Sequence, residues 1–141
     1  MSPVPDDPRR QFDFWVGRWD CAWEGGTGTN VVTPECDGAV IHERFASAEL
    51  SGVSISVYDA SVERWVQSWM DSQRSWFHLT GSFEDGAMNL YTTTADRQGH
   101  RKRMRFDAIT PGGFRWSWSR SRDMSEWEAV WTIDYRRANA A

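Results

Sequence analysis

Tryptophan is the residue that most constrains this chain, because it occurs ten times in 141 residues. Three pairs have even spacing and would therefore share one face of an extended strand: Trp65 and Trp69, Trp116 and Trp118, and Trp127 and Trp131. Indoles supply large, rigid apolar area together with an N–H that needs a partner when it is buried. This spacing favours a β-barrel with an aromatic, incompletely filled interior. A filled barrel with the indoles as ordinary core stays the alternative.

The composition limits the classes of partner. A chain of this length forms one domain with a substantial core, and its formal net charge is −4. An acidic chain is not expected to bind nucleic acid or an anionic membrane surface. No apolar run approaches the roughly 18 residues of a membrane span, and residues 1–10 lack the apolar segment of a secretory signal. We therefore expect a cytoplasmic protein, either a monomer or a homodimer.

Alternation of apolar and polar residues with period 2 runs from Trp19 to Tyr135. About ten short segments show it, and they are separated by turn signals such as Pro-Gly-Gly at 111–113, which is typical of an all-β fold. An open sandwich would leave sheet edges that need protection. The pattern therefore predicts an antiparallel barrel of about eight to ten strands.

The N-terminal segment shows a different pattern. Asp7 and Pro8 are typical of a helix N-cap and first position, and apolar residues then recur at helical spacing. We expect a short helix over residues 8–15. The barrel domain would then span residues 8–137, between a disordered tail at 1–7 and a second tail at 138–141.

Polar side chains interrupt the apolar faces of the predicted strands. Four of them share parity with aromatic or aliphatic neighbours and would face the barrel interior: Glu43, Gln67, Asp71 and Arg120. A carboxyl buried among indoles has a raised pKa unless a cation such as Arg120 pairs with it. Such a carboxyl can act as a general acid or base. A purely structural ion pair, or a solvated Asp71 at the barrel mouth, stays the alternative.

The last predicted strand, residues 126–137, contributes more of the interior. Its alternation would place five residues on one side: Trp127, Ala129, Trp131, Ile133 and Tyr135.

Metal and cofactor motifs are not found. The three histidines, His42, His78 and His100, are scattered, and the spacing of Cys21 and Cys36 matches no metal pattern. The chain also lacks a phosphate-binding loop and a dinucleotide fingerprint. We expect no metal and no cofactor.

Several sequence blocks resemble a family of small bacterial proteins of unassigned function. Members typically open with Phe-Asp-Phe-Trp-x-Gly-x-Trp-Asp, and residues 12–20 match this block. The match continues through 57–59, 64–71, 81–88 and 119–123, and ends with Trp127, Trp131 and residues 135–137. The resemblance covers nearly all of residues 12–137.

This resemblance implies a lipocalin-like (calycin) barrel with nitrobindins as distant neighbours. Gly17-Arg18-Trp19 is similar to the Gly-x-Trp entry of the first calycin strand, where the indole closes one barrel end under a late arginine. Arg136 or Arg137 would supply that arginine. Nitrobindins bind haem through a histidine late in the chain, and no histidine follows His100 here, so haem is not expected.

Two functional hypotheses follow. The first is a binding protein that holds a small apolar or aromatic molecule in an indole-lined cavity. The second is a cofactor-independent enzyme of small-molecule biosynthesis (a cyclase, isomerase or hydratase), in which Glu43 or Asp71 transfers a proton. The candidate ligand-binding residues are Glu43, Phe45, Gln67, Trp69, Asp71, Trp116, Trp118, Arg120, Trp131 and Tyr135.

Overall fold

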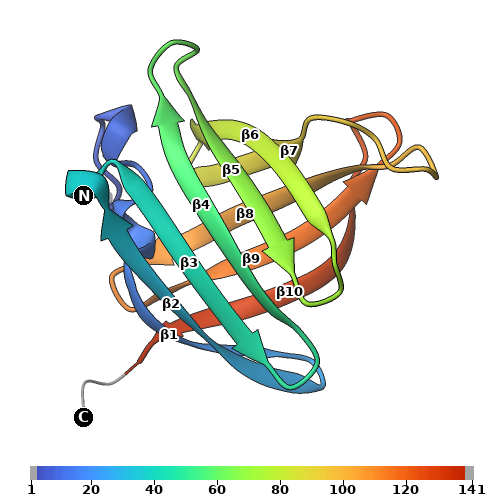
Figure 1. The fold of residues 1–141 in the computed structure, drawn as a ribbon, viewed down its shortest axis with the longest axis horizontal. Helices are drawn as coiled ribbons and strands as arrows, with labels where there is room; N and C mark the ends of the chain where they lie inside the picture. Colours follow the sequence, from blue (N-terminus) through green and yellow to red (C-terminus); the bar gives the residue numbers. More distant parts are fainter. Residues whose placement is uncertain (1–2, 139–141) are drawn as a thin grey trace.

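The computed structural model describes residues 3–138, which form a closed antiparallel barrel of ten strands. Each strand pairs with the next along the chain, and β1 pairs with β10 to close the sheet (Figure 1). The strands are β1 (Gly17–Trp23), β2 (Gly26–Glu35), β3 (Val40–Ser47), β4 (Ser51–Asp59), β5 (Arg64–Asp71), β6 (Trp76–Glu84), β7 (Ala87–Thr92), β8 (Arg101–Thr110), β9 (Gly113–Ser121) and β10 (Glu128–Arg137). The predicted all-β barrel is confirmed.

The N-terminal segment forms two short 3-10 turns, η1 (Pro8–Arg10) and η2 (Asp13–Trp15), where a single helix over 8–15 was expected. The predicted start is right, because the Asp7 carboxylate accepts a hydrogen bond from the backbone N–H of Arg9 at 3.0 Å. A third 3-10 turn, η3 (Cys36–Gly38), connects β2 to β3.

Some described residues of the two predicted tails have contacts with the rest of the chain. Val4 is buried, and the amide of Gln11 donates to the carbonyl of Pro5 at 3.1 Å. The Ala138 N–H donates to the carbonyl of Arg18 at 2.9 Å and extends the pairing of β1 with β10. Residues 1–2 and 139–141 of these tails lie outside the described residues.

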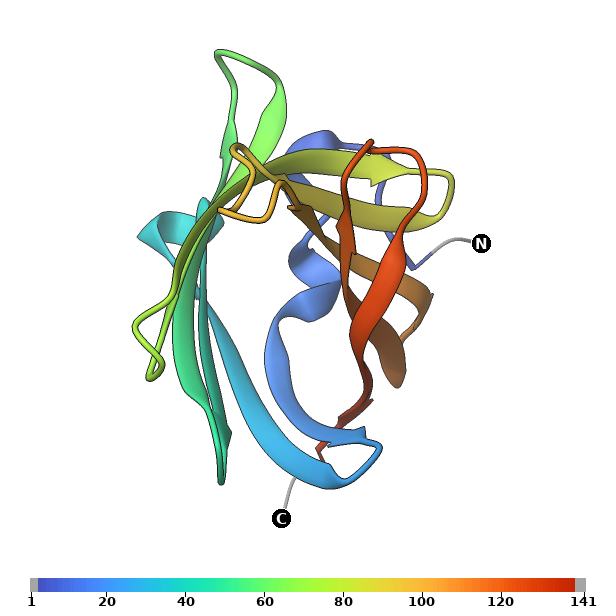
Figure 2. The same ribbon diagram turned by 90° about the vertical axis from the view of Figure 1, so that its right-hand side faces the viewer.

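The two ends of the barrel are built differently. The N-terminal turns lie at one end, together with the β2–β3 connection, at the left of Figure 1. In Figure 2 the same N-terminal segment lies against the strands, which curve around the interior. Phe12 is fully buried there, with its ring 5.1 Å from those of Trp65 and Phe106. We call this the capped end. The opposite end has the β1–β2, β3–β4 and β5–β6 turns, and we call it the open end.

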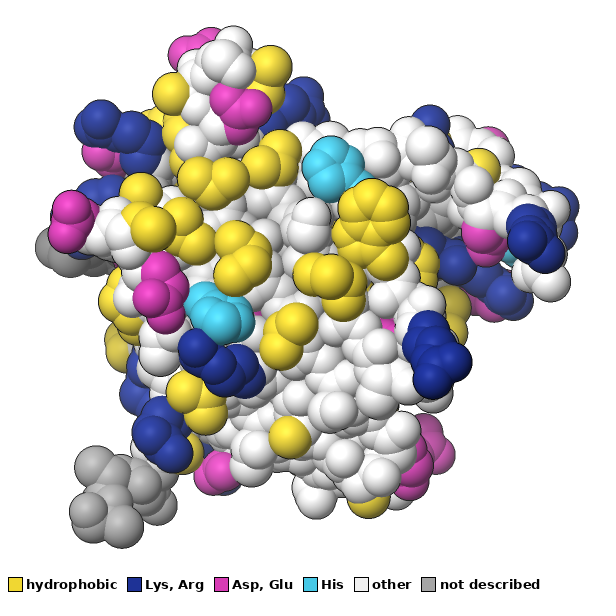
Figure 3. All heavy atoms as spheres, viewed as in Figure 1, with side chains coloured by type: hydrophobic (Ala, Val, Ile, Leu, Met, Phe, Trp, Pro, Cys, Tyr) yellow, Lys and Arg dark blue, Asp and Glu magenta, His cyan; other side chains and the backbone are white. Residues whose placement is uncertain are grey.

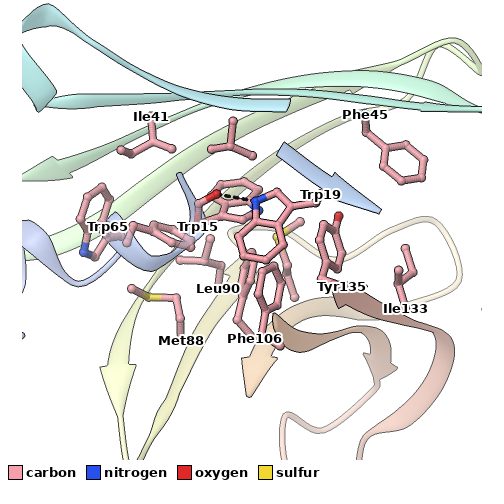
Figure 4. Close-up of a cluster of buried hydrophobic side chains, with 14 of the residues drawn as sticks. Trp15, Trp19, Ile41, Phe45, Trp65, Met88, Leu90, Phe106, Ile133 and Tyr135 are labelled. Atoms are coloured by element: carbon pink, nitrogen blue, oxygen red, sulfur yellow. Dashed lines mark hydrogen bonds between the residues drawn. The ribbon is translucent and has the colours of Figure 1, made fainter. Parts of the chain in front are cut away.

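Trp19 lies at the boundary between the capped end and the open end (Figure 4). It is 1% exposed, and its indole N–H donates to the carbonyl of Trp15 at 2.8 Å. Figure 4 shows Trp15 and Trp65 on one side of Trp19, and Tyr135, Ile133 and Phe45 on the other. Trp19 therefore separates the packed core of the capped end from the interior of the open end.

Arg137 covers the indole of Trp19 from outside. Its guanidinium carbon lies 4.3 Å from the ring centroid, a cation–π arrangement. The same guanidinium donates to the carbonyls of Pro111 and Val16, each at 3.0 Å. Gly17 makes room for this contact: its φ is 142°, and a Cβ there would overlap the Nη1 atom of Arg137. Of the two predicted arginines, Arg137 is thus the one that contacts Trp19, and Arg136 is not.

A β-bulge in β10 overturns the prediction that Trp127 and Ala129 face inward. Trp131 pairs with Trp118 but Ala129 pairs with Ser119, so Val130 is an extra residue that reverses the parity. Val130 and Ala129 are exposed. Trp127 lies on the outer surface, where its ring is 4.8 Å from the guanidinium of Arg103.

The outer face of β3 to β6 carries exposed apolar side chains, which Figure 3 shows gathered over the middle of the sheet. They include Val53, Ile55, Met70 and Trp76, and Trp76 is 68% exposed. None of the helical segments in residues 3–138 is long and apolar enough to span a membrane.

The contacts of Trp19 predict a large effect of its truncation. Trp19→Ala should lower the free energy of unfolding by about 3–5 kcal/mol, because it leaves a cavity and removes the contact with Arg137. Trp76→Ala is the matched control, because truncation of this exposed side chain should lower the free energy of unfolding by less than about 0.5 kcal/mol. Urea denaturation measures both values. Equal losses for the two variants would contradict the role given to Trp19.

Candidate functional site

A cavity of about 220 Å³ lies inside the barrel toward the open end. Eight of the ten predicted ligand-binding residues line it: Glu43, Phe45, Trp69, Asp71, Trp116, Trp118, Trp131 and Tyr135. Leu50, Gln73, Ser75, Phe77, Met104 and Ile133 complete the lining. An engineered cavity of about 150 Å³ holds benzene, so this volume suits a molecule with one or two rings.

Glu43 on β3 is the buried acid of the cavity. Its side chain accepts a hydrogen bond from the Ser54 hydroxyl at 2.6 Å and another from the Asn30 amide at 2.7 Å. These donors come from the neighbouring strands β4 and β2, which pair with β3 on either side. Burial raises the pKa of Glu43 to about 7, and the two hydrogen bonds oppose that rise. Glu43 can therefore hold or release a proton near neutral pH.

Tyr135 on β10 connects to the same polar cluster. The Asn30 amide donates to its hydroxyl at 2.9 Å while also donating to Glu43. Burial, together with the nearby Cys21 and Glu43, holds the pKa of Tyr135 well above its usual value. Burial likewise raises the pKa of the Cys21 thiol to about 12. Both groups are therefore neutral over the range in which Glu43 titrates.

The aromatic walls stand at right angles to one another. The rings of Trp116 and Trp118 are nearly parallel, with centroids 6.3 Å apart. Trp131 is perpendicular to Trp116, at an angle of 87° and 5.5 Å between centroids. Phe77 packs against Trp118 at 5.1 Å. The indoles therefore form a corner around the cavity.

Trp69 and Asp71 form the part of the wall contributed by β5. The indole N–H of Trp69 donates to the Asp71 carboxylate at 2.8 Å. The other oxygen of Asp71 accepts from the backbone N–H groups of Gln73 and Ser75, at 2.9 and 3.2 Å, so this carboxylate closes the β5–β6 turn. Gly52 on β4 lies beneath the Trp69 ring, where a Cβ would overlap the indole. Asp71 is thus at the mouth of the cavity, the alternative left open by the sequence.

Gln67 and Arg120 are not in the cavity lining, contrary to the sequence prediction. Gln67 does face the interior, but one layer nearer the capped end, where its amide donates to the Ser56 hydroxyl at 2.9 Å. Arg120 has the predicted parity, but it lies at the rim of the barrel. Its guanidinium donates to the Glu128 carboxylate at 2.8 and 3.0 Å. The β10 bulge brings Glu128 opposite Arg120, and no sequence pattern indicates this bulge.

Asn30 is the important residue that the sequence analysis did not single out. It is fully buried on β2, opposite Trp19 on β1 and Phe45 on β3. An Asn between two buried aromatic positions would have been the signal, but the weak alternation of β2 concealed its parity. The buried Oδ1 of Asn30 accepts no hydrogen bond from residues 3–138.

Comparison of the sequence with models of known protein families finds no match. Comparison with curated proteins finds none either.

The raised pKa of Glu43 predicts a pH-dependent stability. The folded chain holds a proton that the unfolded chain releases above its usual pKa of 4.5. The resulting stabilisation is fully present below about pH 4.5 and is lost as the pH rises through about 7. Its size is up to roughly 3 kcal/mol.

Urea denaturation across this pH range compares the protein with Glu43→Gln, which cannot titrate and should lack this loss. Glu128→Gln, at the exposed rim, should retain it. Parallel pH profiles for the protein and Glu43→Gln would show that Glu43 does not titrate differently in the two states.

Proposed function

We propose that this protein binds a small apolar or aromatic molecule inside the barrel. The observation that carries the proposal is the cavity of about 220 Å³ whose walls include four indoles and whose lining includes the buried Glu43. Ligand sites are mostly apolar concavities with a few placed polar groups. A core that served packing alone would favour an aliphatic residue over a buried carboxyl at this position.

The two ends of the barrel support the same proposal. The capped end is filled by Phe12, Trp15 and Trp19, so packing alone can close this interior where the chain supplies side chains. The open end keeps its volume although four indoles line it.

We also infer membership of the bacterial family with calycin barrels, supported by the closed sheet and by the position of Arg137 over Trp19 next to Gly17.

NMR spectroscopy of the indole N–H groups tests binding directly. Toluene, indole and phenethyl alcohol are the probes, because each has one or two rings. We expect the signals of Trp69, Trp116, Trp118 and Trp131 to shift on titration, while exposed Trp76 and outward-facing Trp127 stay unchanged. The proposal fails if none of these probes moves a cavity signal.

A larger side chain that fills the cavity should weaken ligand binding. Ile133→Phe adds volume at a lining position and should weaken the affinity for these probes by at least about tenfold. Ile55→Phe is the matched control on the outer face of β4, where Ile55 is 41% exposed. Equal affinities of the two variants would place the binding site outside the cavity.

A second candidate function is general acid–base catalysis, favoured by the pKa of Glu43 near 7 within the cavity. Cyclases, isomerases and hydratases all require a proton transfer, which a group with this pKa performs well at neutral pH. Asp71 is the weaker candidate, because its oxygens accept hydrogen bonds from Trp69 and from the β5–β6 turn.

Nitrobenzisoxazole tests this catalysis, since its ring opens when a base removes the proton on carbon. Ionised Glu43 should accelerate the opening, with a rate that rises with pH through about 7. Glu43→Gln should abolish the acceleration, and Glu128→Gln at the rim should retain it. A rate unaffected by Glu43→Gln would remove Glu43 as the base.

A further inference from the structure

The cavity is electrostatically one-sided. Its lining includes two carboxyl groups, those of Glu43 and Asp71, and no Lys, Arg or His among residues 3–138. The cations at the open ends of the neighbouring strands β8 and β9 have other partners. Arg120 pairs with Glu128 at 2.8 Å, and Lys102 pairs with Asp96 at 2.9 Å. Cationic side chains therefore do not neutralise the acids of the cavity from within.

Glu43 retains capacity to bind a ligand. An ionised carboxylate offers about four acceptor positions, and Glu43 uses one for Ser54 and one for Asn30. Each of its oxygens therefore keeps an acceptor position for a donor in the cavity. An uncompensated buried carboxylate is unfavourable, and a cationic partner in the cavity would relieve that cost.

The indoles around Glu43 provide the second attraction. A cation is attracted to the face of an aromatic ring, and indole gives the strongest interaction of this kind. Trp116 and Trp131 both line the cavity, and their rings are perpendicular to each other. Aromatic walls at right angles beside a carboxylate form a site suited to an organic cation.

We propose that the cavity binds a small amine in its protonated form, with the ammonium group between the Glu43 carboxylate and the indole faces. This inference rests on the proposed function, since it names the chemical class of the ligand for the same cavity. An aryl-alkyl amine fits best. Its ring packs against the apolar side chains of the cavity, and its ammonium group donates N–H hydrogen bonds to Glu43.

Binding of a cation should be coupled to the ionisation of Glu43. The groups that face Glu43 are Asn30 on β2, Ser54 on β4 and Tyr135 on β10, with Cys21 on β1 nearby and Asp71 at the mouth. Only Glu43 has its pKa near 7 among Glu43, Tyr135 and Cys21. The amine binds the ionised form, so its affinity should fall as the pH falls through about 7.

Phenethylamine and phenethyl alcohol are the probes for this inference. They have the same number of non-hydrogen atoms and differ in charge. Calorimetric titration above pH 7 should give at least about tenfold tighter binding of the amine than of the alcohol. This preference should shrink below pH 7, whereas the affinity for the alcohol should not increase with pH.

Glu43→Gln should remove the preference for the amine while the alcohol still binds, which also shows that the variant folds. Glu24→Gln, in the exposed β1–β2 turn, changes the formal charge of the chain equally at the open end, leaves the Arg120–Glu128 pair intact and should retain the preference. If Glu43→Gln does not fold, the pH dependence of the unmodified protein decides the question, and a preference that is constant with pH overturns the proposal.

The failures of the two proposals differ. Equal binding of both probes, or tighter binding of the alcohol, contradicts the cation and leaves the binding function standing. An amine preference that survives in Glu43→Gln removes Glu43 as its partner. Binding of neither probe contradicts the binding function itself.

Discussion

The pairing of β1 with β10 is the constraint on which the rest of the structure depends. It closes the sheet, so every strand has one face inside and the interior must be either filled or left hollow. The same pairing places Arg137 opposite Trp19, where the guanidinium covers the indole. The N-terminal turns then fill one end, while the indoles of the other end surround a cavity.

The polar groups inside the barrel are its main unfavourable feature. Glu43 is buried with two hydrogen-bond donors, and these only partly offset the loss of water around a carboxylate. The buried oxygens Asn30 Oδ1 and Gln67 Oε1 accept no hydrogen bond from residues 3–138. Such groups weaken a structural core. Of these groups only Glu43 lines the cavity, so its carboxyl is the one that can orient a ligand there.

The fold followed from the sequence because a barrel strand repeats with period 2, and the parities of Glu43, Trp69, Trp116 and Tyr135 predicted their convergence. The sequence predictions that the structure contradicts have local causes. The bulge at Val130 reversed the parity of Trp127, and sequence periodicity does not register an inserted residue. Arg120 had the right parity, but parity fixes only the face and not the depth along the barrel. Gly52 illustrates a signal that could have been used: glycine inside a strand marks a close approach, here of Trp69.

A crystal structure of the protein soaked with bromobenzene would show whether the open end holds a preformed ligand cavity, because anomalous scattering locates bromine without ambiguity. We expect a bromine peak inside the barrel, bounded by Trp116, Trp131 and Glu43, with these side chains in their present positions. Indoles that have collapsed to fill the open end, with bromine absent from the interior, would contradict a preformed ligand cavity.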